Sequence, residues 1–197
     1  MTGTFVSLSH REREGAAKRR EGEGRAVYLP SPRAAAQLAP LPQGEGRKIT
    51  ILPAHLTHIG PIATRMRDAD RVECAALGHS PKQALRAGLA SSSPAWTALV
   101  DGRAEAMFGL VVTSALGGEG RPWLLGSDAI YAHPRAMLRR GPRFLAAMFH
   151  SAPRLSNLVA ADNVRAIRLL RRWGFTLDKE TTMIGNIAFR LFHAERR

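Results

Sequence analysis

The chain has 197 residues, of which 45% are hydrophobic, and its formal net charge is +13. This length and apolar content suffice for one domain with a buried core. The single cysteine, Cys74, excludes a disulfide framework, and no Cys/His spacing predicts a metal site. No signal sequence and no run of about 18 apolar residues is found, which predicts a cytoplasmic protein without membrane contact.

The positive charge raises the question of nucleic-acid binding, because clustered Lys and Arg gain affinity by displacing counterions from phosphate. Residues 1–48 carry nine basic and five acidic side chains, so most of the excess belongs to the rest of the chain. There is no RNP-like aromatic pattern, no zinc-finger spacing and no interleaving of aromatic with basic residues. The sequence therefore favours a solvated basic surface over a nucleic-acid partner.

The first part of the chain differs in composition from the rest. Residues 1–47 are rich in Arg, Glu, Gly, Pro and Ala and show no period of 2 or 3.6. Such a segment cannot bury enough apolar surface to offset the entropy lost on ordering. We therefore expect 1–47 to be a disordered, low-complexity basic tail and 48–197 to be one folded domain.

The folded region opens with a β-branched run, 48–54, which predicts a strand. Apolar residues at helical spacing follow over 57–77, and Ser80-Pro81 starts a second helix. The later segments are predicted in this order: strands 95–102 and 105–114, loop 115–122, strand 123–132, helix 134–150, strand 154–161, helix 162–173 and strand 182–193. A hairpin region that leads into a β-α-β-α unit predicts a mixed α/β sheet flanked by helices.

Two of these segments carry glycine or proline. Gly141-Pro142 is expected to interrupt helix 134–150 or to start it afresh, since proline removes an N–H from a helix. The glycine-rich stretch 115–122 has no helix start behind it. We therefore interpret it as a flexible loop and not as a phosphate site.

The last helix, "DNVRAIRLLRRWGF" at 162–175, is strongly amphipathic. Asp162 or Asn163 can accept hydrogen bonds from the first turn, and Gly174 can end the helix in the left-handed conformation before Phe175 returns to the core. The predicted buried stripe consists of Ala166, Ile167, Leu170 and Trp173. The four arginines of the helix must then face solvent.

Within this order of elements, Asn163, Ala166, Leu169 and Gly174-Phe175 are spaced as N-x-x-A-x-x-L-x-x-x-x-G-F. This pattern resembles the GNAT family of acyl-CoA-dependent N-acyltransferases, over 49–192. The phrases "RMRDADRVECAAL", "WTALVDG" and "WLLGSDAI" resemble a phage and prophage branch, which includes GNAT-like internal virion proteins of short-tailed phages. The resemblance implies a GNAT-like twisted central sheet, acetyl-CoA as cofactor, an amine acceptor and, for the phage branch, other virion proteins as partners.

The resemblance also suggests candidate site residues. The catalytic candidates, as acid or base, are Asp128, Tyr131 and His133. The cofactor-binding candidates are Ile130, Tyr131, Arg139, Arg140, Gly141, Asn163 and Ala166. Backbone N–H groups of a strand at 127–132 are expected to hold the oxyanion. A purely structural role is the alternative for Asp128 and His133, and Asn163 stays open between a helix cap and a ligand contact.

Two positions depart from the family pattern. The family often places a tyrosine after the conserved leucine to protonate the departing thiolate, whereas this chain has Leu170, which cannot donate a proton. The family's pyrophosphate loop presents backbone N–H groups at a helix start. Here the matching stretch, 139–148, contains Pro142, which lacks an N–H, and Arg143 in place of a small residue.

Two functions remain open from the sequence. The first is an acyl-CoA-dependent N-acetyltransferase. The second is a catalytically inactive GNAT-fold phage protein that acts as a virion component or binding module. Leu170 and the altered pyrophosphate loop favour the second, while Asn163 and the geometry of the last helix permit the first.

Overall fold

An eight-stranded mixed sheet forms the centre of a computed structural model, which describes residues 49–196. The predicted tail, 1–47, lies outside the described residues. Neighbouring strands follow the order β1-β2-β3-β4-β5-β8-β6, and β7 pairs with β8. The strands are β1 Ile49–Pro53, β2 Ala95–Val100, β3 Arg103–Ser114, β4 Glu119–Gly126, β5 Arg154–Ala160, β6 Thr176–Leu177, β7 Thr182–Ile184 and β8 Ile187–Glu195. All pairs are antiparallel except β4 with β5, so the predicted mixed α/β architecture is confirmed.

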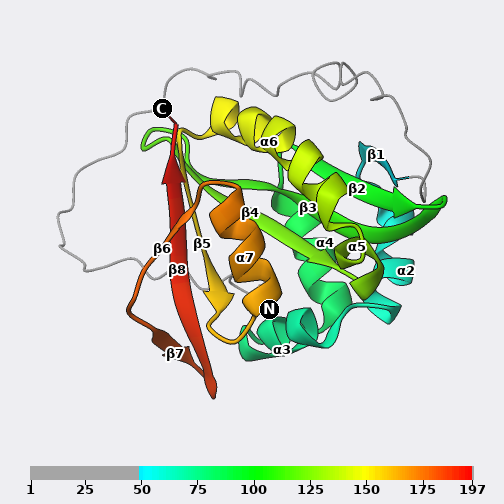
Figure 1. Cartoon of the computed structure of the whole chain (residues 1–197), viewed down its shortest axis with the longest axis horizontal. Helices are drawn as coiled ribbons and strands as arrows, with labels where there is room; N and C mark the ends of the chain where they lie inside the picture. The colour runs from blue at the N-terminus through cyan, green and yellow to red at the C-terminus, as the bar shows by residue number, and fades with distance from the viewer. Residues whose placement is uncertain (1–48, 197) are drawn as a thin grey trace, which may run out of the picture. The chain divides into compact units, whose positions relative to one another are not determined.

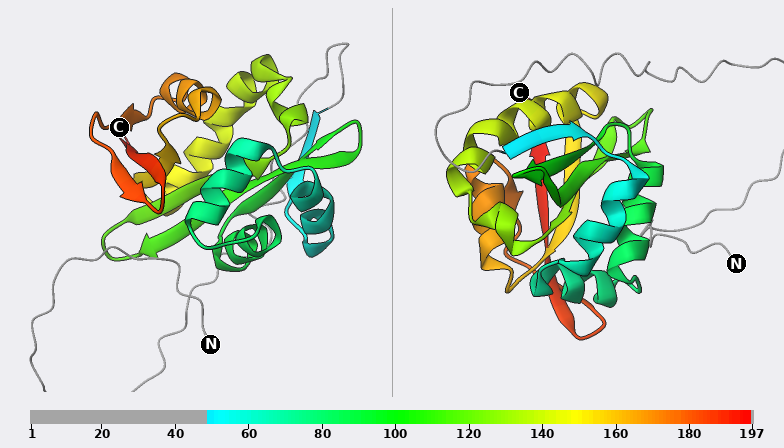
Figure 2. Two further views of the ribbon diagram at one scale, coloured as in Figure 1. Left: turned by 90° about the horizontal axis from the view of Figure 1, so that it is seen from below. Right: turned by 90° about the vertical axis from the view of Figure 1, so that its right-hand side faces the viewer.

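Helices cover both faces of this sheet. They are the 3-10 helix η1 Leu56–His58 and the α-helices α2 Ile59–Thr64, α3 Asp68–Ala76, α4 Pro81–Ser91, α5 Asp128–Tyr131, α6 Pro134–Ser151 and α7 Val164–Arg172. Helices α6 and α7 lie on one face, and α2, α3 and α4 lie on the other (Figures 1 and 2). Accordingly, Leu110 of β3 packs in one core cluster with Phe144 and Ile167, while Met107 packs in another with Leu85. The alternation of side chains along a strand thus supplies both cores.

The outer edge of β8 is covered by two short strands. β6 pairs with its C-terminal half, where Thr176 lies opposite His193, and β7 pairs with its N-terminal half, where Thr182 lies opposite Phe189. The turn between β7 and β8 contains Gly185 at φ +57, a conformation that costs glycine little. The predicted single strand 182–193 is therefore a hairpin.

The predicted single helix 57–77 is divided into η1, α2 and α3. The backbone is extended at Arg67, with φ −63 and ψ 152, just before α3 begins. The Arg67 N–H donates to the carbonyl of Gly126 on β4 at 3.0 Å, and the Arg65 guanidinium donates to a carbonyl of β3 at 2.8 Å. These bonds to the sheet hold the break in place. As a result Val72, one of the apolar residues at helical spacing in this segment, is 43% exposed.

Strand β4 differs from its predicted bounds at both ends. It begins at Glu119, inside the predicted loop, and it ends at Gly126. Ser127 then accepts a hydrogen bond from the Ala129 N–H at 3.2 Å and caps α5. The strand predicted to reach residue 132 is therefore replaced by a helical turn after 126.

Helix α6 is continuous although Pro142 stands inside it. Pro142 is exposed, whereas Gly141 is buried against the Trp173 indole beyond the end of α7. A Cβ atom at position 141 would lie 2.2 Å from that indole. Glycine at this position therefore permits the close approach of α6 to Trp173, and the predicted interruption of the helix is wrong.

Gly141→Ala is expected to lower the free energy of unfolding by about 1 to 3 kcal/mol, because the added methyl group overlaps the Trp173 indole. Urea denaturation measures this change. Gly60→Ala on α2 is the matched control, since no atom lies within 4 Å of its Cβ position and alanine is the better helix former. Equal stability of Gly141→Ala and the unmodified chain would contradict the contact.

Candidate functional site

The parallel strands β4 and β5 separate soon after they pair. Pairing is confined to 119–120 of β4 and 154–155 of β5, and the Arg154 N–H donates to the carbonyl of Gly118 at 2.9 Å. Alternate residues of a strand face the same neighbour, so the N–H of residue 122 would be among the next to face β5. Residue 122 is proline, which has no N–H. The ladder therefore ends there.

The side chain of Asn157 lies between the strands at this point. Its Nδ2 donates to the carbonyl of Pro122 at 2.9 Å, and its Oδ1 accepts from the N–H of Leu158 at 2.8 Å. The side-chain amide thus takes the place of a direct backbone bond between β4 and β5. Pro122 and Asn157 together mark the start of the separation.

Leu124 follows on β4, and its backbone faces the separated side. The carbonyl of Pro122 is bonded from β5, and the N–H of Gly126 is bonded from α3, so both residues point away from β3. Leu124 lies midway between them and, at the two-residue period of a strand, points its N–H and C=O the same way. It offers one donor and one acceptor where β5 has moved away.

Polar side chains of α3 and its surroundings lie at the separated ends of β4 and β5. We call this group the α3 network; it consists of Arg67, Asp70, Glu73 and Asn163. Asp70 Oδ2 accepts from the Gly126 N–H at the end of β4, at 2.9 Å. Glu73 Oε1 accepts from the Ala160 N–H at the end of β5, at 3.2 Å, and from Asn163 Nδ2 at 2.6 Å. Two carboxylates of one helix therefore connect both strand ends.

Arg67 supplies the positive charge of the network. Its NH2 lies 2.5 Å from Asp70 Oδ1, and its NH1 donates to Asn163 Oδ1 at 3.2 Å. The guanidinium carbon lies 4.1 Å from the centre of the Tyr131 ring. Arg67 and Asp70 are 6% and 1% exposed, so the loss of either partner would leave a buried, uncompensated charge.

The two carboxylates of the network differ in what their oxygens contact. Both oxygens of Asp70 are engaged, one by Arg67 and one by Gly126. The hydrogen bonds that Glu73 accepts from residues 49–196 all end on Oε1, which leaves Oε2 for another donor. Burial raises the pKa of Glu73; the Asn163 amide opposes this and the Asp70 carboxylate adds to it. A carboxylate with a raised pKa is suited to accept a proton near neutral pH.

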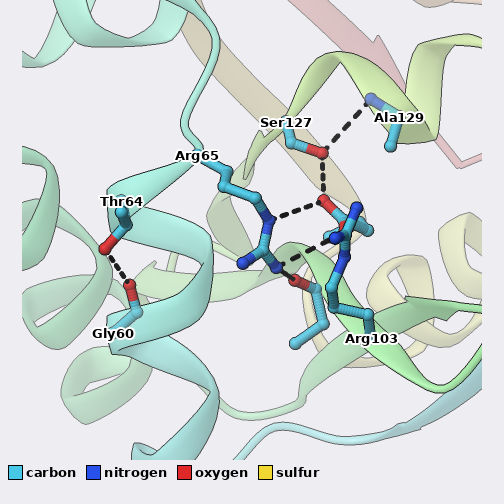
Figure 3. A network of polar contacts seen from close by, with 8 residues as sticks. Gly60, Thr64, Arg65, Arg103, Ser127 and Ala129 are labelled. Carbon is cyan, nitrogen blue, oxygen red and sulfur yellow. Dashed lines mark hydrogen bonds and ion pairs between the residues drawn. The ribbon is translucent and has the colours of Figure 1, made fainter.

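Another buried carboxylate, Glu105 of β3, joins α2, β3 and the start of α5. The side chains of Arg65, Arg103 and Ser127 converge on Glu105 (Figure 3). Ser127 Oγ donates to Glu105, Arg103 Nε lies 2.5 Å from Oε1, and Arg65 NH2 lies 3.4 Å from it. Burial opposes ionisation, but the bonds from Ser127 and Arg103 outweigh it and hold the pKa of Glu105 below its usual range. Glu105 therefore stays ionised and fixes these elements.

Three residues that the sequence predicted for the site make no hydrogen bond or ion pair with the α3 network in the described part of the chain. Asp128 begins α5 instead of lying on a strand, and its exposed carboxylate pairs with Arg165 of α7 at 3.1 Å. His133 precedes α6, and its Nε2 is buried without a hydrogen-bond partner among the described residues. Ile130 is buried in the core. Because 128–131 is helical, the expected oxyanion donors of a strand at 127–132 are not formed.

The predicted pyrophosphate loop is the interior of α6. Arg139 is exposed there, and Arg140 donates to the carbonyl of Ile49 on β1 at 2.5 Å. The helix itself begins with Pro134, which has no N–H. The carbonyl of His133 accepts two N–H groups of the first turn, at 3.1 and 3.2 Å. The start of α6 therefore lacks the cradle of backbone N–H groups that the resemblance implied.

Two residues that the sequence predicted for the site, Tyr131 and Asn163, both contact the Arg67 guanidinium. Tyr131 lies under this group, and burial raises the pKa of the phenol. Asn163 bonds to it and also accepts the Ala166 N–H at 3.3 Å, which confirms the predicted cap of α7. Ala166 is half-buried beside the core. Glu73 was not predicted, although Asp70 and Glu73 stand three residues apart on α3 and so lie on one side of it.

Solved structures with a similar fold include acetyltransferases. The aminoglycoside acetyltransferase AAC(6')-Ib in complex with coenzyme A matches with a TM-score of 0.55 and 16% identity, over 76% of this chain and 95% of that chain. A GNAT-family acetyltransferase from Bacillus anthracis matches with a TM-score of 0.56 and 9% identity, over 76% and 95%. The ribosomal-protein-S5-alanine acetyltransferase from Vibrio fischeri matches with a TM-score of 0.55 and 12% identity, over 78% of this chain and 96% of that chain.

These likenesses show that the chain has the GNAT acetyltransferase fold, as the sequence predicted. At the level of sequence, no protein-family model matches the chain, and no curated protein matches it. None of the helices described between 49 and 196 is long and apolar enough to cross a membrane.

The raised pKa of Glu73 makes its effect on stability depend on pH. The folded chain keeps this proton over a range in which the unfolded chain has lost it, so this contribution to the free energy of unfolding falls as pH rises from about 4. In urea denaturation, the stability of the unmodified chain relative to Glu73→Gln should fall as pH rises through and above the usual carboxyl range.

Glu105→Gln provides the contrast for this measurement. The pKa of Glu105 is lowered, so its contribution is present above the usual carboxyl range and is lost as pH falls through the folded value. The relative stability of the unmodified chain should therefore rise with pH in this pair. A rise with pH for the Glu73 pair would contradict the assignment.

Proposed function

We propose that this chain is an N-acyltransferase that takes its acyl group, acetyl in the first instance, from the pantetheine thioester of acyl-CoA. One observation carries the proposal. Strands β4 and β5 separate beyond Pro122, and Glu73 lies at the end of β5, where its Oε1 accepts from the Ala160 N–H and its Oε2 is left for another donor. An acyl-CoA supplies a thioester that an amine can attack.

The residues present fit one part of such a donor better than the other. An extended amide chain can bond to the N–H and C=O of Leu124 in the way that a missing strand would. By contrast, the start of α6 offers no N–H cradle for a pyrophosphate. Arg139 is left as an exposed charge partner for phosphate. The proposed binding site therefore relies on the strand separation for the thioester arm and on side-chain charge for the phosphates.

Glu73 is the proposed proton acceptor for the acceptor amine. An ammonium group must lose a proton before its nitrogen can attack a carbonyl carbon. Glu73 Oε2 accepts that proton, while Oε1 stays bonded to Ala160 and Asn163 and fixes the carboxylate. Arg67 and Asp70 act as positioning residues, because they hold Asn163 and the end of β4.

Glu73→Gln should reduce acetyl transfer by about a hundredfold or more, because the amide cannot accept the proton but keeps an acceptor for Ala160. The assay follows release of the CoA thiol from acetyl-CoA in the presence of a panel of primary amines. Asp68→Asn, an exposed carboxylate on the same helix, should transfer at the unmodified rate. Full activity of Glu73→Gln would remove Glu73 from this role.

The proposed function itself has a separate test. Isothermal titration calorimetry with acetyl-CoA should show saturable binding to the full chain. The absence of both binding and amine-dependent thiol release would overturn acyl transfer.

The second candidate is a GNAT-fold protein of phage type that does not transfer acyl groups and acts as a virion component or binding module. Two observations favour it. Leu170 is half-buried against the core instead of presenting a proton donor. The start of α6 lacks the N–H cradle described above.

Leu170→Tyr distinguishes the two candidates. If the chain transfers acyl groups without an acid at this position, a phenol should raise turnover, since general acid catalysis contributes about a hundredfold or more. If the helix is structural only, the larger ring should cost about 1 to 3 kcal/mol and create no activity. Leu169→Tyr, at the neighbouring half-buried position, controls for the cost of a phenol on this helix. We expect the gain in turnover.

A further inference from the structure

The outer surfaces of α6 and α7 carry a high positive charge. Helix α6 contains four arginines and no acidic residue, and α7 contains four arginines and no acidic residue. Both helices lie on the same face of the sheet (Figure 1), and Gly141 of α6 packs against Trp173. We call the exposed arginines of the two helices the basic face; they are Arg135, Arg139, Arg165, Arg168, Arg171 and Arg172.

Local acidic groups neutralise little of this charge. Asp128 pairs with Arg165 at 3.1 Å, and both side chains are largely exposed. Asp162 stands exposed just before α7. The spacing of the remaining arginines follows helical rows: Arg135 and Arg139 are one turn apart on α6, and Arg168 and Arg172 are one turn apart on α7. Each helix therefore presents a row of guanidinium groups about 6 Å apart along its axis.

The uncharged side chains of this face indicate the kind of partner. Interfaces with proteins depend on apolar and aromatic anchors near their centre. Among the described residues of α6 and α7, Val164, at the first position of α7, is the one exposed large apolar side chain. Interfaces with nucleic acid are polar and strongly positive. The guanidinium group also suits phosphate, since it presents several N–H donors in a fixed plane.

The aromatic residues of these helices argue further for a double strand. Phe144, Phe149 and Trp173 all pack against the core beneath α6 and α7. No Phe, Tyr or Trp ring of either helix is therefore available on the basic face to stack on an unpaired base; the exposed ring is the imidazole of His150, in the last turn of α6. The arginines of this face are therefore expected to contact phosphates.

We propose that the basic face binds the phosphate backbone of double-stranded nucleic acid without sequence preference. The sequence did not favour such a partner, because it has no RNP-like aromatic pattern, no zinc-finger spacing and no interleaving of aromatic with basic residues. The fold places α6 and α7, which carry these arginines, on the same face of the sheet (Figure 2). The basic face shares Arg139 with the proposed acyl-CoA site, and the test uses no acyl donor.

The test is fluorescence anisotropy of a labelled 20-base-pair DNA duplex with the full chain, at about 50 to 200 mM salt. Binding in the micromolar range at low salt is expected, as is usual for non-specific complexes. The variant Arg139→Gln/Arg168→Gln should bind at least about tenfold more weakly. Its slope of log K against log salt should be shallower by about two, since each lost phosphate contact removes about 0.9.

The matched control is Lys82→Gln/Arg86→Gln, which removes two exposed charges from α4 on the other face of the sheet. It should retain the affinity and salt slope of the unmodified chain. Arg171→Gln/Arg172→Gln is a second exposed pair on the basic face, and it replaces the first if that variant does not keep the thermal midpoint.

Four outcomes would overturn the proposal: no binding at about 50 mM salt, equal weakening in the basic-face and control variants, tighter binding to a single strand of the same length, or tighter binding to vesicles of phosphatidylserine. The last would assign the surface to an anionic membrane. Equal weakening would assign the binding to diffuse charge. Each result is independent of whether acetyl-CoA binds.

Discussion

The site depends on one missing hydrogen-bond donor. Parallel strands stay together only while each strand supplies N–H groups to the other, and Pro122 has none to supply. The Asn157 amide bonds to the carbonyl that the ladder leaves behind. Beyond this point β4 and β5 diverge. The N–H and C=O of Leu124 face the gap that β5 leaves, on the side of β4 opposite β3. A single proline thus ends the pairing of β4 with β5 and leaves a gap between these two central strands of the sheet.

An opening of this kind exposes buried backbone groups, and the α3 network compensates for them. The N–H groups of Gly126 and Ala160 would be costly to bury without acceptors, and Asp70 and Glu73 supply these acceptors. Two carboxylates in one buried place repel each other, which Arg67 offsets for Asp70 more than for Glu73. Burial raises the pKa of both carboxyl groups, Asp70 and Glu73. Both oxygens of Asp70 are engaged, by Arg67 and by the Gly126 N–H, whereas Glu73 keeps Oε2 for another donor, which is the property that the proposed chemistry uses.

The sequence predicted features that depend on neighbouring residues. The cap at Asn163, the outward arginines of α7 and the order of most elements follow from local patterns, and the structure agrees with them. The break between α2 and α3 was not predicted, because its cause is a bond from Arg67 to a strand far along the chain. Glu73 was missed for the same reason, since its partners at 160 and 163 are 87 and 90 residues away.

The misplaced phosphate loop has a different origin. In the sequence, Arg139, Arg140 and Gly141 resemble part of the family's pyrophosphate loop. Gly141 is instead small because the Trp173 indole lies against it, and the helix tolerates Pro142 on its solvent side. A glycine required for packing and a glycine required for phosphate binding cannot be distinguished by sequence when the packing partner lies on another helix.

The pairing of β6 and β7 along β8 also affects how the molecule behaves at high concentration. An unpaired strand edge offers a row of N–H and C=O groups to any other extended chain, which is a common route to aggregation and to strand exchange between copies. Here β7 pairs with Ile187 to Phe189 of that edge, β6 pairs with Phe192 and His193, and between them the Asp178 N–H donates to the carbonyl of Leu191 at 2.9 Å. These backbone groups of β8 are bonded within the chain and are not open to a strand of a second copy. The outer edge that remains consists of β6 and β7, which are two and three residues long, and such short edge strands give an added strand few groups to pair with.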